Sequence, residues 1–175
     1  MSVLTDAEKV AFLRDHIPYR VVQLMGHPRY QARLSRTLQR VDYVHLRPGL
    51  LEITFIAGRV LMEFLGVDAD KDGNLVNKHV RMRAWDVKVT DLDVGFLDKN
   101  NPSDLSPEEC DLLGKFMYRA SKAAAHLTWK DPSSDHYLLV DKGANLISGI
   151  LQRHLYTPKN LDLESIVGGW LRGVR

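Results

Sequence analysis

The chain has 175 residues, of which 45% are hydrophobic and 26% charged, and its formal net charge at pH 7 is +2. This composition is typical of one globular domain and excludes a disordered chain. The single cysteine, Cys110, excludes an internal disulfide. No apolar run approaches the about 20 residues that span a bilayer, and the acidic N-terminus is unlike a signal peptide. We therefore expect one cytoplasmic domain over residues 1–175, without a membrane segment.

The N-terminal third of the chain carries several helix signals. Thr5 and Glu8 form a capping box, and Pro18 suits the first turn of a second helix. The most apolar stretch, LLEITFIAGRVLMEFLG, is long enough for a core helix, and Gly66 suits its C-terminal end. The elements expected here are helices over about 5–16, 18–25, 29–46 and 50–66, with a turn at 47–49.

The remainder of the chain begins with its least regular part, about 67–105, in which DVKVT at 86–90 alternates like a short strand. Ser106, Pro107 and Glu109 then predict a capped helix to about residue 127. Apolar residues at helical spacing predict further helices over about 136–156 and 160–172. The fold class expected is all-α, a single bundle of five to six helices with one long irregular insert at about 67–105.

Arg119 and His126 stand seven positions apart in the predicted 106–127 helix, which places them within about 20° of each other on one face. A neutral imidazole can accept the proton of a ribose 2′-hydroxyl, and a guanidinium can hold the phosphate. The pair is therefore a candidate catalytic site for metal-independent RNA cleavage. The alternative is that the spacing arises by chance and has no function, with His126 favoured by the negative end of the helix dipole.

The stretch RASKAAAHLTW at 119–129 resembles the signature helix of HEPN-type helical domains, in which four to six residues separate an arginine from a histidine. IPYRVVQLM at 17–25 and AGRVLMEFLG at 57–66 are similar to two further helices of uncharacterised bacterial HEPN-like proteins. Together these pieces extend the resemblance over most of residues 15–156.

The resemblance implies an α-helical bundle that forms a homodimer. In active members the Arg–His helices of two subunits meet in a composite RNA-cleaving site, so Arg119 would hold phosphate and His126 would be the base. Active members usually carry a polar residue directly after the arginine, whereas this chain has Ala120. Many HEPN-like domains are non-catalytic.

A second feature points to nucleic acid independently of that pair. Between Arg20 and Arg47 there are six arginines and one acid, Asp42. Five of the arginines would fall within about 60° of one another on the helical wheel of one continuous helix, namely Arg29, Arg33, Arg36, Arg40 and Arg47. One interpretation is a surface that follows the phosphates of a polyanion. The other is pairing with acids elsewhere, such as those of the acidic 86–111 segment.

The segment DADKDGNL at 68–75 resembles the start of an EF-hand loop, with Asp68, Asp70, Asp72 and Gly73 in register. The twelfth position, where a bidentate glutamate belongs, is His79. The sequence DKDG is also typical of a turn. A surface loop is therefore the preferred interpretation, and weak calcium binding is an alternative. We expect no metal centre and no cofactor.

The sequence thus leaves two main functional hypotheses open. The preferred one is a non-catalytic binding module that uses the arginine face for a nucleic-acid or protein partner. The alternative is a metal-independent endoribonuclease that uses Arg119 and His126 at a dimer seam.

Overall fold

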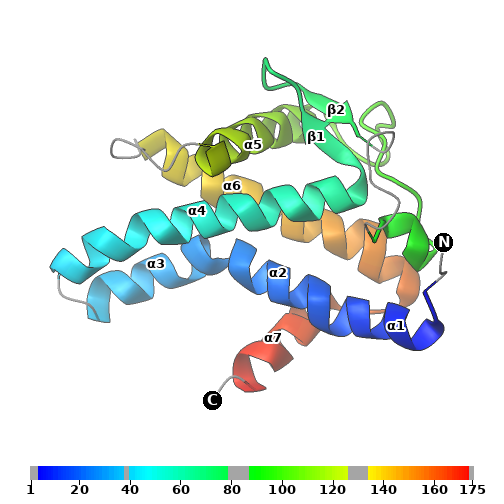
Figure 1. Ribbon diagram of the computed structural model, residues 1–175, viewed down its shortest axis with the longest axis horizontal. Coiled ribbons are helices and arrows are strands. Elements are labelled where there is room, and N and C mark those ends of the chain that lie inside the picture. The colour runs from blue at the N-terminus through cyan, green and yellow to red at the C-terminus, as the bar shows by residue number, and fades with distance from the viewer. Residues whose placement is uncertain (1–3, 38–39, 79–86, 126–133, 174–175) are drawn as a thin grey trace.

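The computed structural model describes residues 4–37, 40–78, 87–125 and 134–173. Helices dominate these residues and the one sheet found among them has two strands, which confirms the all-α class (Figure 1). The α-helices and strands, in chain order, are α1 (Asp6–Ala11), α2 (Ile17–Leu24), α3 (Gly26–Thr37), α4 (Arg40–Leu65), β1 (Val67–Ala69), β2 (Leu75–Asn77), α5 (Pro107–Ala125), α6 (Ser134–Leu151) and α7 (Leu163–Gly173).

Both predicted capping boxes are present. The Thr5 backbone N–H donates to the Glu8 carboxylate at 2.7 Å, and the Glu8 N–H donates to Thr5 Oγ1 at 3.3 Å. Ser106 and Glu109 make the same reciprocal pair at 2.9 and 3.2 Å. Because each cap satisfies N–H groups that a helix start leaves without partners, these starts are determined by local sequence.

The predicted turn at residues 47–49 is wrong, because α4 runs through Pro48 without interruption. The prediction of one helix over 29–46 is also wrong, because residues 29–37 belong to α3 and residues 40–46 to α4. An internal proline removes one hydrogen bond of the helix. The burial of Leu51, Phe55 and the rest of the apolar face of α4 outweighs that local cost.

The predicted insert at about 67–105 contains local structure of its own. Gly66, at φ +97°, ends α4 in the left-handed region that favours glycine, and the chain turns into the β1–β2 hairpin. The strands are antiparallel, with Asp68 opposite Val76. The strand predicted at 86–90 is wrong: Val89–Leu92 form a 3-10 turn, and residue 86 lies outside the described residues.

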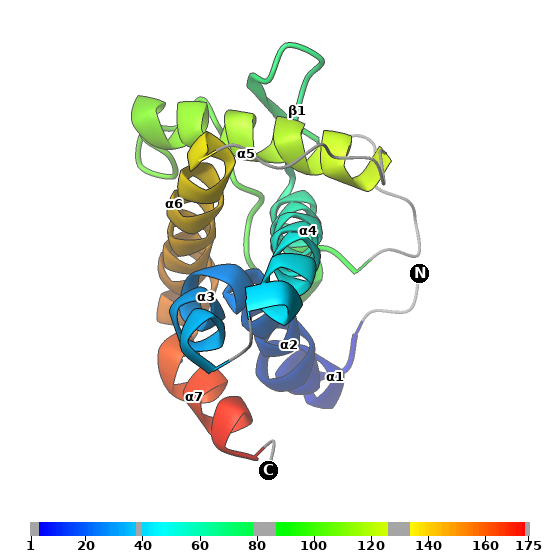
Figure 2. The same ribbon diagram turned by 90° about the vertical axis from the view of Figure 1, so that its left-hand side faces the viewer.

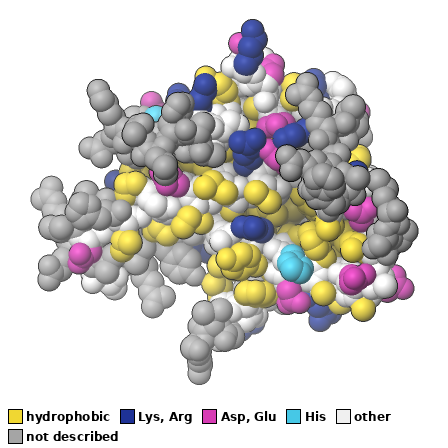
Figure 3. Space-filling view, in the orientation of Figure 1, with side chains coloured by type: hydrophobic (Ala, Val, Ile, Leu, Met, Phe, Trp, Pro, Cys, Tyr) yellow, Lys and Arg dark blue, Asp and Glu magenta, His cyan; other side chains and the backbone are white. Residues whose placement is uncertain are grey.

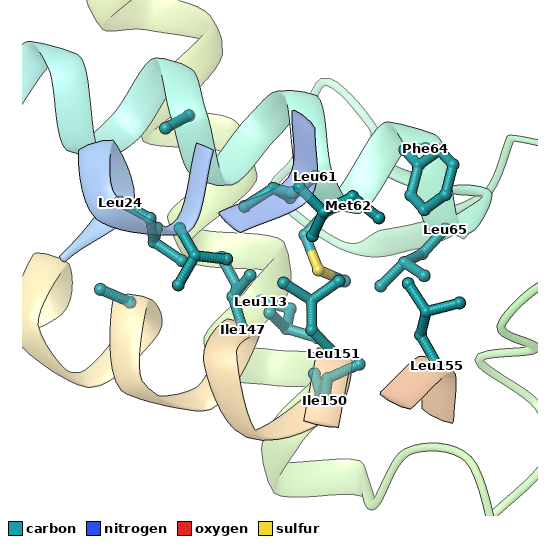
Figure 4. Close-up of a cluster of buried hydrophobic side chains, with 14 of the residues drawn as sticks. Leu24, Leu61, Met62, Phe64, Leu65, Leu113, Ile147, Ile150, Leu151 and Leu155 are labelled. Carbon is teal, nitrogen blue, oxygen red and sulfur yellow. The ribbon is translucent and has the colours of Figure 1, made fainter. Parts of the chain in front are cut away.

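Helix α4 lies at the centre of the bundle (Figure 1). Helices α2 and α3 run along one side of it, and α5 crosses over both α4 and α6, as Figure 2 shows. The core fills the space between these helices (Figure 4), where the side chains contributed by α2, α4, α5, α6 and the turn after α6 include Leu24, Leu61, Met62, Leu113, Ile147 and Leu155.

Phe116 of α5 is inserted between two glycines of neighbouring helices. A Cβ at Gly58 of α4 would lie 2.5 Å from Phe116 Cε1, and a Cβ at Gly143 of α6 would lie 2.9 Å from Phe116 Cγ. The ring also contacts Phe55, with centroids 4.9 Å apart. The two missing side chains therefore create the slot that lets α5 approach α4 and α6.

Two π-helical turns meet at the other end of the core. They are Phe12–His16, which joins α1 to α2, and Gln152–Tyr156, which follows α6. The Tyr156 hydroxyl donates to the Leu13 carbonyl oxygen at 2.7 Å in a fully buried position. Burial raises the pKa of Tyr156 well above its usual value, so the hydroxyl remains a donor at all physiological pH.

We expect Gly143→Ala to destabilise the fold by about 1–3 kcal/mol, because the new methyl group overpacks the slot of Phe116. Gly149→Ala, on the same helix, is the matched control. Gly149 is exposed and a Cβ there would meet no atom within 4 Å, so this change should stabilise the protein by about 0.5–1 kcal/mol through helix propensity. Urea unfolding of both variants measures the difference. Equal unfolding midpoints would show that Phe116 does not depend on the missing side chain at Gly143.

Candidate nucleic-acid interface

The five arginines predicted to share one helical face lie on two helices. Arg29, Arg33 and Arg36 belong to α3, whereas Arg40 and Arg47 belong to α4. The single-wheel prediction is wrong, because it assumed one continuous helix from Arg29 to Arg47, whereas α3 and α4 are two helices that pack against each other. Helices α3 and α4 lie side by side, and their joined ends form one end of the molecule (Figure 1). We call α3 with the first two turns of α4 the basic hairpin.

Two arginines of the basic hairpin are accessible to a ligand. Arg29 and Arg36 are both exposed. Within the described part of the chain, neither forms an ion pair or a side-chain hydrogen bond. Asp42 remains the one acid in the sequence between Arg20 and Arg47. The positive charge of this surface is therefore not neutralised by the described side chains around it.

The alternative partners, the acids of the 86–111 segment, are engaged elsewhere. Their described ion pairs are Asp93 with Lys9 at 2.8 Å, Glu109 with Arg153 at 2.9 Å and Asp111 with Lys115 at 2.6 Å. No described contact joins an acid of this segment to Arg29 or Arg36. The charges of the two regions are thus separate features of the surface.

Arg47 differs from the other members of the set. Its side chain is half-buried, and its guanidinium carbon lies 3.5 Å from the centroid of the Tyr137 ring of α6. A guanidinium stacked on an aromatic face is stabilised by the ring quadrupole and by dispersion. Arg47 therefore holds α4 on α6 and is less free than Arg29 or Arg36 to bind a ligand.

A fully buried histidine, His27, also contacts Tyr137 where α3 packs on α6. His27, in the first turn of α3, stacks on Tyr137 with centroids 5.3 Å apart, and its Nδ1 lies 2.9 Å from Asp141 Oδ1. Its backbone N–H donates to the buried Thr54 hydroxyl at 3.3 Å. Among the described residues Nε2 has no hydrogen-bond partner.

An aspartate behind an imidazole is the arrangement that orients a general base. In this structure the ring of His27 has no exposed surface, so no substrate reaches Nε2. The cluster joins α3, α4 and α6 and sets the direction of the basic hairpin. Nothing in the sequence pattern connects positions 27 and 141, and sequence reasoning therefore missed it.

The structure describes half of the predicted catalytic pair. Arg119 is exposed on α5, whereas His126 lies outside the described residues. Another histidine, His136 at the start of α6, is half-buried close enough to Arg119 to feel its charge. Burial, and secondarily Arg119, lower the pKa of His136 below its usual value, while Asp135 opposes this. This electrostatic influence acts between two helices, α5 and α6, and was not predicted from the sequence.

The calcium-like segment forms the turn of the β1–β2 hairpin. Asp70 Oδ1 accepts the backbone N–H groups of Asp72 and Asn74 at 2.9 Å each, and the hydrogen bonds from Asn74 lower the pKa of Asp70. Asp68 pairs with Lys78 at 2.8 Å. No cluster of three or more potential metal ligands occurs among the described residues, and His79 lies outside them. The described contacts are those of an ordinary turn.

Cys110 lines a pocket between the turn of the β1–β2 hairpin and the start of α5, together with Asn74 and Lys99. Its Sγ donates to the Lys99 carbonyl at 3.7 Å. Burial raises the pKa of this thiol despite the opposing charge of Lys99. A thiol that stays protonated at neutral pH is a weak nucleophile, so the pocket has no activated cysteine.

No family model, curated protein or solved structure matches this chain. The HEPN resemblance therefore stays a prediction. No helix in the described ranges is both long and apolar enough to cross a membrane.

We expect Arg47→Gln to lower the free energy of unfolding by about 1–2 kcal/mol, because it removes the stacked guanidinium from Tyr137. The matched change Arg36→Gln, at an exposed position of the same hairpin, should stay within about 0.5 kcal/mol of wild type. Chemical denaturation distinguishes the two. Equal effects would show that Arg47 has no greater part in packing than Arg36.

Proposed function

We propose that this chain is a helical binding module whose basic hairpin binds the phosphate backbone of nucleic acid. The observation that carries the proposal is the exposure of Arg29 and Arg36 without an acidic partner among the described residues. The net charge of the whole chain is only +2, so an attraction for polyanions has to come from a local surface.

The type of cation supports phosphate as the ligand. From position 20 to position 47 the chain has six arginines and no lysine. The planar guanidinium presents paired donors that match two phosphate oxygens, and it is more weakly hydrated than an ammonium group. Contacts of this kind follow the backbone and read no bases, so we expect binding with little dependence on sequence.

The environment of α5 supports binding without catalysis. Ala120, which directly follows Arg119, is fully buried in the core. In active members of the family that the chain resembles, this position is usually polar. Here the residue after the arginine contributes to packing, and it cannot assist Arg119 at the surface.

The test measures binding of a short fluorescein-labelled single-stranded RNA as a function of salt. We expect Arg29→Gln/Arg36→Gln to weaken binding about tenfold, with a log–log salt slope about 1.4 smaller, since each phosphate contact on a single strand contributes about 0.7. The matched control is Arg14→Gln/Lys71→Gln, which removes two exposed positive charges outside the basic hairpin, one between α1 and α2 and one in the β1–β2 turn. This control should bind nearly as wild type does.

Equal weakening by both double variants would show that total charge, not the basic hairpin, governs binding. A wild-type protein that binds neither single-stranded RNA nor duplex DNA at low salt would overturn the proposal.

A metal-independent endoribonuclease is the second candidate, and it is favoured by the packing of α5 on α6, across which the charge of Arg119 acts on His136. A histidine with a lowered pKa is neutral at physiological pH, the form that accepts a proton from a 2′-hydroxyl. The exposed guanidinium of Arg119 on the neighbouring helix can hold the scissile phosphate. The candidate base is then either His126, as the sequence predicts, or His136.

Under this second candidate, RNA cleavage persists in EDTA and falls by about a hundredfold or more in Arg119→Gln. Parallel assays of His126→Ala and His136→Ala identify the base, because only the variant that lacks it loses activity. A control for folding is the far-ultraviolet circular dichroism of each variant. Wild-type protein that binds RNA but leaves it intact in EDTA would exclude this candidate and leave the binding module.

A further inference from the structure

Helix α4 is apolar on the side that faces away from the core. Four of the seven large hydrophobic side chains that are exposed among the described residues lie there, and we call these four the α4 stripe: Leu46, Ile53, Ile56 and Val60, at 51%, 45%, 44% and 43% exposure. Single exposed apolar residues are common, but several on one face of a helix mark an interaction surface. Hydrophobic side chains gather along α4 in Figure 3.

The spacing of the stripe is that of a helix-pairing seam. Its members are separated by seven, three and four residues, which is the alternation of a and d positions in a heptad. The vacant d position between Leu46 and Ile53 is Gly49, which is exposed and where a Cβ would meet no atom within 4 Å. The seam therefore has a row of knobs and one open hole.

The charges beside the stripe are complementary to each other. Glu52 and Arg59 lie seven residues apart, both at g positions on the same side of the seam. Glu52 is half-exposed and makes no ion pair within the described residues. Arg59 uses Nε for Glu63 Oε1 at 2.7 Å, and its two Nη groups can still donate to another carboxylate.

We propose that two copies of this chain pair through their α4 stripes in antiparallel orientation about a two-fold axis. In that orientation g positions face g positions, so Glu52 of each copy meets Arg59 of the other. Ile53 packs against Ile56 of the second copy, and Val60 enters the hole above Gly49. In a parallel pair Glu52 would instead face Ala57, which is buried. Charge complementarity thus selects both the second copy as occupant and its direction.

This interface differs from the dimer seam predicted from sequence, which lay on the helix that carries Arg119. Leu46 lies within the basic hairpin, but the interface does not depend on the proposed nucleic-acid binding, because none of its residues belongs to the set of five arginines. An interface made by one helix pair is at the small end of stable assemblies, so we expect a reversible dimer whose population rises with protein concentration.

The first test is sedimentation velocity over a range of protein concentrations. Wild type should shift from monomer to dimer, whereas Ile53→Lys/Ile56→Lys should raise the dissociation constant by about tenfold or more, because it places charges at the centre of the seam. The control, Val10→Lys/Leu138→Lys, adds the same charge at exposed apolar positions on α1 and α6 and should dimerise as wild type does. A wild type that stays monomeric, or equal effects of both pairs, would overturn the proposal.

The second test addresses orientation. Glu52→Arg and Arg59→Glu should each weaken the dimer by opposing like charges, and the double variant should restore it, because the pair is then reversed in both copies. Thermal unfolding checks that loss of the Arg59–Glu63 contact leaves the fold intact. Dimerisation that the double variant does not recover would overturn the antiparallel pairing.

Discussion

The insertion of the Phe116 ring between Gly58 and Gly143 is the constraint on which the helix arrangement depends. A side chain on either glycine would occupy the volume of the ring, so α4, α5 and α6 reach their observed separations only because both positions lack one. The ring of Phe55, which contacts the ring of Phe116, closes the slot from the side of α4. The crossing of α5 over α4 and α6 (Figure 2) is the geometric result.

With one side of α4 committed to that core, its remaining surface carries the features that point to function. Its N-terminal turns extend beyond the core with α3 as the basic hairpin, whose direction is set by Arg47 on Tyr137 and by His27 against Asp141. The outward face of the same helix carries the α4 stripe. An antiparallel pairing through that stripe would place the two basic hairpins at opposite ends of a dimer and leave both accessible.

Much of the fold was predictable because it depends on contacts that are local in sequence. Helix starts at Thr5 and Ser106, the end of α4 at Gly66 and the all-α class follow from capping groups and from apolar spacing within a few turns. Pro48 is the instructive failure. Its local preference for a turn is real, but burial of the apolar face of α4 outweighs it.

The sequence by itself determined the class of fold and the concentration of arginine between positions 20 and 47, because composition and spacing are properties of the chain. Tertiary structure alone decided where these side chains lie: it divides the five arginines of the predicted face between two helices, removes Arg47 from the free surface and buries His27. It also places His136 on α6 where burial and the charge of Arg119, on α5, lower its pKa. Each of these outcomes depends on packing between helices distant in sequence, and no periodicity within one helix encodes such a contact.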